Sequence, residues 1–249
     1  MCQATATKSF IFFQGILTNA LFLIEYQSVI NFTGVSKTYG NNWTALSNIN
    51  LKIDKGEFIF VTGPTGAGKT TLLRLIYREE LPSVGIVNVL EQNLASLRQK
   101  DIPNLRRQIG IVFQDFKLLY ERTAYENLEF SLRVIGTPKA VLKKKIADTM
   151  DRLGIWHKKD NYPFELSGGE QQKVSLARGL IKDPAILLAD EPTGNIDPAG
   201  SAEILNIFKE LNYQGTTVIM ATHNTELAAA SRKRVVALEK GKIVSDGIV

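Results

Sequence analysis

Cysteine and histidine are scarce in this sequence, and their scarcity excludes several kinds of site. The 249 residues include one cysteine, Cys2, and two histidines. A disulfide framework and a metal site built from cysteines both need more than one thiol, so neither is expected. Two histidines leave little room for a histidine metal cluster. The lack of a disulfide framework fits a reducing compartment.

A strong excess of charge of one sign is also missing. The chain has 30 basic and 25 acidic residues, which gives a net charge of +5. So small an excess fits binding to a nucleotide or to an anionic membrane surface, and by itself it does not indicate a nucleic-acid partner. Hydrophobic residues make up 44% of the chain, enough for a sizeable core in one large domain or in one domain with an inserted lobe.

Long apolar runs are absent beyond the N-terminus. Ser9–Ile24 is strongly apolar, but it is interrupted and shorter than the roughly 20 residues that a membrane-spanning helix needs. No small-residue cleavage site follows it, as a signal peptide would require. We expect the domain to begin at Val29, with residues 1–28 lying upstream of the true start; a membrane or targeting role is the alternative. Because no other segment could span a bilayer, we expect the body to be soluble.

Strand-like and helix-like segments alternate from Val29 onward. Ile49, Leu51 and Ile53 alternate with polar residues, as in a strand that is buried on one face. The continuously apolar segment Phe58–Thr62 predicts a buried parallel strand. Further strands are expected at 109–114, 185–190, 216–222 and 234–239, and helices at 69–77, about 199–211 and 224–231.

The chain from about residue 116 to 180 is mostly helical in its pattern. Thr137 and Pro138 are expected at the N-cap and the first position of one helix. Its buried stripe is expected to contain Val141, Leu142, Ile146, Met150 and Leu153. We therefore predict an α/β core with a β-rich N-terminal part and an inserted helical subdomain at about 116–180.

The segment GPTGAGKTT matches the phosphate-loop pattern G-x-x-x-x-G-K-[ST], with a strand before it and a helix after it. Its glycines let backbone N–H groups approach a phosphate, and the helix dipole adds positive potential. We expect Lys69 to reach the β- and γ-phosphates of ATP and the Thr70 hydroxyl to bind Mg²⁺. The predicted ATP contacts are Gly63, Pro64, Thr65, Gly66, Ala67, Gly68, Lys69, Thr70 and Thr71.

Two carboxylates follow the apolar strand of the segment ILLADEP. Asp190 stands at the strand's carboxyl end, where α/β sheets hold their ligands, and is expected to position Mg²⁺. Glu191 comes next, where it could accept a proton from an attacking water. Two acids in such a place often form only a helix cap or a turn; the phosphate loop favours the catalytic interpretation.

A second glycine-rich helix start occurs in ELSGGEQQK, and it contains no lysine beside its glycines. Ser167 and Glu170 have the spacing of a capping box, so a well-capped helix is expected. Gly168 and Gly169 add something that a cap does not need, because they leave backbone N–H groups uncovered for a phosphate.

Taken in order, these motifs resemble the nucleotide-binding domain of the ABC ATPases, a group of P-loop NTPases, from Val29 to the C-terminus. The resemblance implies three catalytic residues, Glu191, His223 and Gln114, of which His223 would contact the γ-phosphate. It implies three metal-site residues, Thr70, Gln114 and Asp190.

The same resemblance implies an adenine platform and a second copy of the chain. Tyr39 would stack on adenine, with Trp43 as the nearby competitor. Two chains in head-to-tail pairing would form a homodimer that encloses two ATP molecules, and hydrolysis would open it. The residues that would contact ATP held by the other chain are Ser167, Gly168, Gly169 and Glu170 of the signature helix and Asp197.

A single cassette of this family needs separate membrane subunits, so an integral membrane partner is expected. The segments 112–119, 121–130 and 187–197 most resemble the branch of the family that acts in bacterial cell division. There the ATPase would lie on the cytoplasmic face of the inner membrane and regulate cell-wall hydrolysis through its partner. The alternatives are an ATPase of lipoprotein release or macrolide export and, more distantly, a soluble ABC ATPase that acts on nucleic acid.

The partner's docking surface is expected just after Gln114. Phe116, Leu118 and Leu119 would contribute to it; packing within the helical subdomain is the alternative role of these three side chains.

Overall fold

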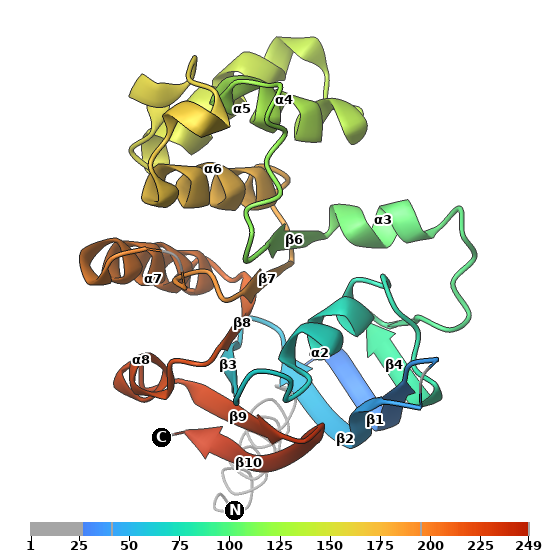
Figure 1. The fold of residues 1–249 in the computed structure, drawn as a ribbon. Helices are drawn as coiled ribbons and strands as arrows, with labels where there is room; N and C mark the ends of the chain where they lie inside the picture. Colours follow the sequence, from blue (N-terminus) through green and yellow to red (C-terminus); the bar gives the residue numbers. More distant parts are fainter. Residues whose placement is uncertain (1–26, 41, 195, 249) are drawn as a thin grey trace, which may run out of the picture.

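The computed structural model describes residues 27–40, 42–194 and 196–248. Within this range, no helix combines the length and the apolarity that crossing a membrane requires. The predicted N-terminal extension lies outside the described residues, apart from Gln27 and Ser28. Figure 1 shows three parts: a small sheet, a larger sheet and a group of helices.

The small sheet is antiparallel and belongs to the N-terminal part of the chain. Its strands follow the order β2-β1-β4-β5. Ile49, Leu51 and Ile53 of β2 are buried between more exposed neighbours, which confirms the predicted alternation. The bounds are β1 Ser28–Thr38, β2 Thr44–Asp54, β4 Val84–Val89 and β5 Gln92–Asn93.

The larger sheet has six strands in the order β10-β9-β3-β8-β7-β6, and only β10 runs antiparallel to its neighbour. Alternate residues of its strands pack into two different hydrophobic cores. Phe60 and Met220 face one core, while Ile59 and Ile219 face the other. Burial on both faces explains the continuous apolar runs. The bounds are β3 Phe58–Thr62, β6 Ile109–Val112, β7 Ile186–Asp190, β8 Thr217–Thr222, β9 Arg234–Glu239 and β10 Lys242–Ile248.

Helices connect the strands, and three of them gather at one end of the molecule. Figure 1 shows α4, α5 and α6 together there, with the small sheet at the other end. These three helices lie between β6 and β7 in the chain, where the helical subdomain is predicted. The bounds are α2 Lys69–Ile76, α3 Ile102–Arg107, α4 Ala124–Val134, α5 Lys139–Arg152, α6 Gly168–Leu180, α7 Pro198–Tyr213 and α8 Thr225–Ala230, with single turns at Trp156–Lys158 and Pro163–Glu165.

The start of α5 differs from the prediction. Pro138, and not Thr137, occupies the N-cap, because its ψ of 140° is still extended and helical geometry begins at Lys139. Val141 is also wrongly assigned to the buried stripe, since its side chain is 48% exposed. Leu142, Ile146, Met150 and Leu153 are buried, as expected. A helix turns by about 100° per residue, so adjacent positions 141 and 142 cannot share one narrow stripe.

Candidate nucleotide-binding site

The candidate site lies where four parallel strands end. The segments that follow β3, β6, β7 and β8 meet there, because the carboxyl ends of parallel strands share one edge of a sheet. They enclose a cavity of about 280 Å³. Trp43 lines it, and so do these predicted residues: Thr65–Thr71, Gln114, Asp190, Glu191 and His223.

Two positions of the glycine-rich loop before α2, Gly63 and Gly68, can be occupied only by glycine. Gly63 and Gly68 have φ angles of 145° and 107°. A Cβ on Gly68 would lie 2.6 Å from the Ala45 carbonyl oxygen, and one on Gly63 would overlap the Leu238 carbonyl. Within the described part of the chain, no side chain caps the start of α2, and no acidic residue lies in its first turn. The positive end of this helix is therefore not neutralised by side chains of its own.

Lys69 is held under this loop. Its side chain is buried, and Nζ donates hydrogen bonds to the carbonyl oxygens of Gly63 at 2.7 Å and Pro64 at 3.2 Å. The ammonium group also lies 3.5 Å from Oε1 of Glu191. Gly63 and Pro64 thus position the lysine, although they do not line the cavity themselves.

Thr70 and Asp190 form a second polar contact at the cavity wall. The Thr70 hydroxyl lies near the Asp190 carboxyl group, whose Oδ1 is buried and has no hydrogen-bond partner among the described residues. Burial raises the pKa of Asp190, and the charge of Glu191 adds to this; Thr70, Lys69 and Arg74 oppose the rise. A hydroxyl beside an incompletely satisfied carboxylate matches the oxygen donors that Mg²⁺ prefers.

Glu191 and His223 are brought together from two different strands. Glu191 has a φ of 48°, and its backbone N–H donates to the Ala221 carbonyl. Its Oε2 accepts hydrogen bonds from Nδ1 of His223 at 2.9 Å and from the His223 backbone N–H at 3.2 Å. With Nδ1 as the donor, the ring's other nitrogen is the acceptor in the neutral imidazole. The carboxylate is almost buried, whereas the imidazole is 65% exposed.

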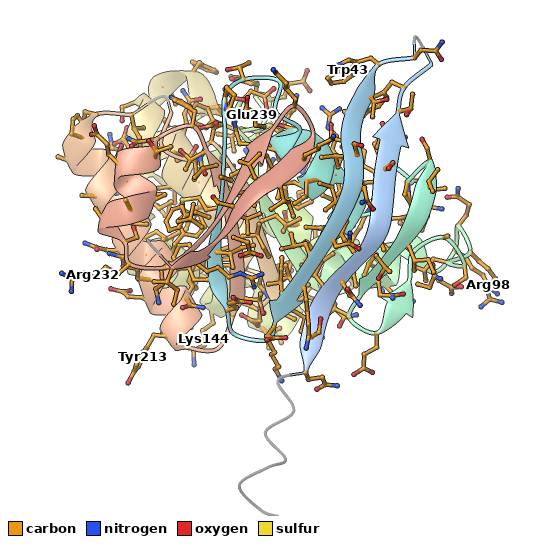
Figure 2. The ribbon with its side chains drawn as sticks, turned by 90° about the horizontal axis from the view of Figure 1, so that it is seen from below. Trp43, Arg98, Lys144, Tyr213, Arg232 and Glu239 are labelled. Carbon is orange, nitrogen blue, oxygen red and sulfur yellow. The ribbon has the colours of Figure 1, made fainter. Side chains whose placement is uncertain are left out.

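Of the two aromatic candidates, the structure places Trp43 on the cavity wall and Tyr39 behind it. The two rings are stacked, with their centroids 5.5 Å apart. Trp43 is half exposed, and Tyr39 does not line the cavity. Figure 2 shows Trp43 at the same end of the molecule as Glu239, opposite Lys144 and Tyr213.

The signature residues lie outside this cavity, at the start of α6. The predicted capping box is confirmed: Ser167 is the N-cap and its Oγ accepts from the Glu170 N–H, while Glu170 Oε2 accepts from the Ser167 N–H at 2.8 Å. The backbone hydrogen bond from Ser167, with a smaller contribution from Lys158, holds the pKa of Glu170 below its ordinary value. Gly168 and Gly169 form the first turn of the helix.

Asp197 also caps a helix, away from the cavity. It is the N-cap of α7, and its Oδ1 accepts from the Gly200 N–H at 2.8 Å. Within one chain, the structure therefore brings the phosphate loop, Gln114, Asp190, Glu191 and His223 together, and leaves Ser167–Glu170 and Asp197 apart from them.

Sequence comparison relates this chain to proteins of bacterial cell division. The family model of the ABC transporter matches residues 46–194, more than half of the chain. The cell division ATP-binding protein FtsE of Bacillus subtilis (strain 168) is 47% identical over 218 residues, which cover 88% of this chain and 96% of that protein. FtsE of Escherichia coli (strain K12) is 42% identical over 215 residues, 86% of this chain and 97% of that protein.

Solved structures of ATP-binding cassettes have the same fold. The dimeric cassette MJ0796 in a post-hydrolysis state, bound to ADP and Pi, superposes with a TM-score of 0.80 at 33% identity, covering 88% of this chain and 98% of that one. CbiO1 from Clostridium perfringens, part of the cbiONQ transporter complex, gives a TM-score of 0.82 at 29% identity over 89% of each chain. The chain therefore belongs to the ABC transporter family, as an ATP-binding cassette of the FtsE group.

Proposed function

We propose that this chain hydrolyses ATP as the ATPase subunit of a membrane complex in bacterial cell division. Its partner is an integral membrane protein of the FtsX type, through which it regulates cell-wall hydrolysis from the cytoplasmic face of the inner membrane. One observation carries the ATPase activity: the phosphate loop, a buried lysine and a carboxylate–histidine pair line the same cavity. The name shared by the FtsE relatives supports the role in cell division.

The triphosphate of ATP binds at the start of α2. Lys69 lies within this loop and close to Glu191, so its ammonium group is placed to contact the β- and γ-phosphates. Trp43 provides the aromatic face for adenine at the open side of the cavity, and Tyr39 supports the Trp43 ring from behind. This arrangement gives the predicted stacking role to the pair of rings instead of to Tyr39 alone.

The metal site consists of Thr70, Asp190 and Gln114. Thr70 and Asp190 are already in contact, and Gln114 lines the same cavity. When bound, Mg²⁺ neutralises charge on the β- and γ-phosphates. A cation beside Asp190 also favours its ionised form, which burial disfavours.

Glu191 acts as the general base. Its Oε1 lies near Lys69 and its Oε2 is held by His223, so both oxygens have fixed directions at the place where the γ-phosphate is expected. The carboxylate accepts a proton from the attacking water, and His223 orients the carboxylate through Nδ1. Gln114 helps to position the water.

The start of α6 serves the ATP of a second copy. A Cβ on Gly169 would meet nothing closer than Ile196 Cγ2, at 3.9 Å, so packing within this chain does not require glycine there. Glycine at both positions leaves the backbone N–H groups at the positive end of the helix open to a phosphate. Asp197 lies at the same contact between the two chains of the dimer. The dimeric state of the MJ0796 cassette supports this pairing.

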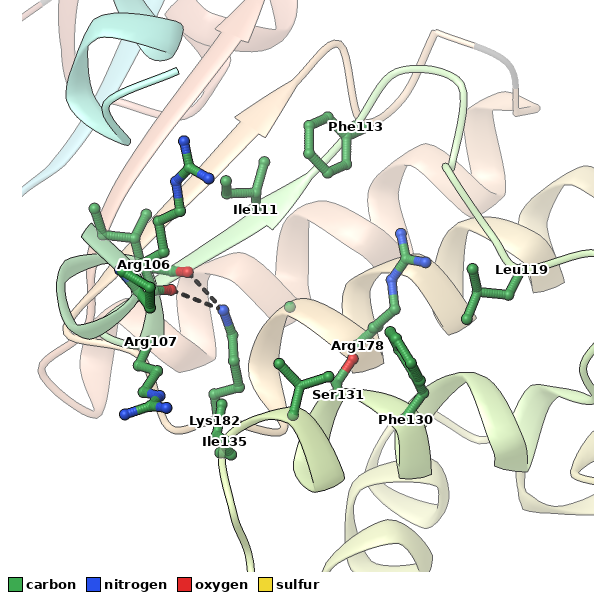
Figure 3. A pocket seen from close by; sticks show the side chains of 14 residues that line it. Arg106, Arg107, Ile111, Phe113, Leu119, Phe130, Ser131, Ile135, Arg178 and Lys182 are labelled. Atoms are coloured by element: carbon green, nitrogen blue, oxygen red, sulfur yellow. Dashed lines mark hydrogen bonds between the residues drawn. The ribbon is translucent and has the colours of Figure 1, made fainter. Parts of the chain in front are cut away.

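The membrane partner docks in a second cavity, of about 490 Å³, between α3, β6, α4 and α6. Figure 3 shows its apolar side chains, among them Ile111, Phe113 and Phe130, together with basic ones. None of the four basic residues forms an ion pair with a carboxylate of the described part of the chain; they are Arg106, Arg107, Arg178 and Lys182. This combination suits an amphipathic helix that carries acidic side chains.

The three residues predicted for docking have different surroundings. Leu119 lines this cavity. Leu118 is buried in the core, and Phe116 packs against that core. Of the three, Leu119 is therefore the residue that we assign to the docking surface.

Replacement of Leu119 by glutamate tests the partner. The Leu119→Glu variant should lose co-purification with the FtsX-type membrane protein from detergent extracts while still binding ATP. Val141→Glu is the matched control, because Val141 is an exposed apolar side chain on α5 outside the cavity. Unchanged co-purification of Leu119→Glu, or equal loss in both variants, would contradict docking at this place.

A further inference from the structure

Two consecutive residues after Gln114 have a strained backbone. Phe116 and Lys117 have φ angles of 56° and 51°, in the left-handed region, and neither is glycine. Such a conformation costs about 1 kcal/mol or more per residue and persists only where the surroundings impose it. The segment 113–120 contains no helix or strand that would do so.

The strained pair is held from α6. The Phe116 carbonyl oxygen accepts hydrogen bonds from Ser175 Oγ at 3.1 Å and from Arg178 Nη2 at 2.9 Å, and Nη1 of Arg178 donates to the Lys117 carbonyl oxygen. Ser175 and Arg178 are three residues apart, so they lie on one face of α6. Two adjacent carbonyl groups thus converge on one guanidinium group.

The loop has a separate attachment further along. Asn127 of α4 is fully buried; its Oδ1 accepts from the Leu119 N–H and its Nδ2 donates to the Leu119 carbonyl. Asn127 fixes the far end of the segment. Among the described residues, Ser175 and Arg178 provide the hydrogen bonds from α6 to the strained pair, which is the part next to Gln114.

The helix that holds this loop is also the signature helix. Arg178 follows the N-cap Ser167 by eleven residues in a helix without interruption. Arg178 also lines the basic docking cavity, at the opposite side of which lies Arg107. Burial lowers the pKa of Arg178, as expected for a cation that contacts carbonyl groups and no carboxylate.

We propose that Arg178, assisted by Ser175, is a positioning residue that fixes the Gln114 loop to the signature helix, so that both move together. This inference rests on the proposed ATPase function and adds a regulatory connection to it. A partner helix in the docking cavity touches the same guanidinium that determines the loop's backbone.

Arginine is needed for this role because its planar fork can donate to two carbonyl groups at once, whereas lysine presents a single point charge. The Arg178→Lys variant keeps the charge but loses the fork. Ser175→Ala is a milder second variant that removes one hydroxyl. Arg107→Ala is the matched control: it removes a cation from the same cavity, and among the described residues Arg107 donates only to Asn104, on its own helix.

The first measurement is hydrogen exchange of the full-length purified chain. The amides of Phe116 and Lys117 should exchange about tenfold faster in Arg178→Lys, and less so in Ser175→Ala, because the strained pair is released. Arg107→Ala should leave their exchange unchanged. Unchanged exchange in Arg178→Lys, or equal acceleration in the control, would overturn the proposal.

The second measurement separates positioning from a general structural effect. Arg178→Lys should lower kcat for ATP about tenfold at unchanged ATP affinity. When combined with Gln114→Ala, it should cause no further loss, because it acts through Gln114. If the two substitutions lowered kcat by independent factors that multiply in the double variant, the inference would be overturned. Neither measurement uses the membrane partner, and a wild-type chain without turnover would refute the ATPase proposal before any variant is compared.

Discussion

The glycine-rich loop before α2 and the glycine pair at the start of α6 differ in what surrounds them. At Gly68 an added Cβ would come within 2.6 Å of a backbone oxygen, whereas at Gly169 the nearest atom would be 3.9 Å away. The first loop is shaped by contacts within the chain. The second leaves space that this chain does not fill, as expected for a surface that meets another molecule.

A carboxyl group in each region also differs in how fully it is satisfied: Asp190 at the cavity and Glu170 at the start of α6. Burial raises the pKa of Asp190, and one of its oxygens has no partner among the described residues. Hydrogen bonds from Ser167 lower the pKa of Glu170, whose cap is complete. The cavity therefore contains a carboxylate that gains from a bound cation, whereas the start of α6 is electrostatically satisfied and offers only its backbone N–H groups.

The largest effect is expected for Glu191→Gln. Loss of the general base should reduce ATP turnover about 1,000-fold. The neutral side chain can still fill the same space, so ATP binding should persist and a dimer should accumulate. Turnover and the elution volume in size-exclusion chromatography with ATP test this. Near-normal turnover would remove Glu191 from the role of base.

Gly68→Ala should damage the fold itself. A positive φ and overlap with the Ala45 carbonyl predict a loss of about 3 kcal/mol in the free energy of unfolding. Urea denaturation followed by circular dichroism measures the loss, and ATP binding should fall with it. Full stability in this variant would show that the loop is less constrained than its geometry indicates.

Gly169→Ala should separate stability from activity. The methyl group has room within the chain, and alanine favours a helix, so the free energy of unfolding should stay within about 0.5 kcal/mol of wild type. ATP binding to the monomer should be unchanged, while turnover of the dimer should fall about tenfold. If ATP affinity of the monomer fell as much as turnover, the proposed contact with the second copy would be wrong.

Asp190→Asn is expected to stabilise the chain while reducing activity. Because the pKa of Asp190 is raised in the folded state, its ionisation opposes folding as the pH rises, and at low pH this penalty vanishes. The variant should therefore have a higher free energy of unfolding than wild type at pH 7 and nearly the same one at pH 3. Its Mg²⁺-dependent turnover should fall. A gain of equal size at both pH values would exclude titration of Asp190 as the cause.

Much of this architecture follows from local patterns. The apolar run Phe58–Thr62 and the capping box at Ser167 depend on neighbouring residues, and both form as expected. The start of α5 differs from the prediction by one residue: the pattern favours Thr137 as the N-cap, whereas the extended backbone of Pro138 puts the N-cap there.

The sequence by itself determined the strands of the larger sheet that precede the site, the phosphate loop and the order of the motifs, because these depend on spacing along the chain. Only the tertiary structure decided which aromatic ring reaches the cavity, that Glu191 meets both Lys69 and His223, and that Arg178 holds the loop after Gln114. Each of these contacts joins residues from separate elements. Their distances are set by how sheets and helices pack, which no local pattern contains.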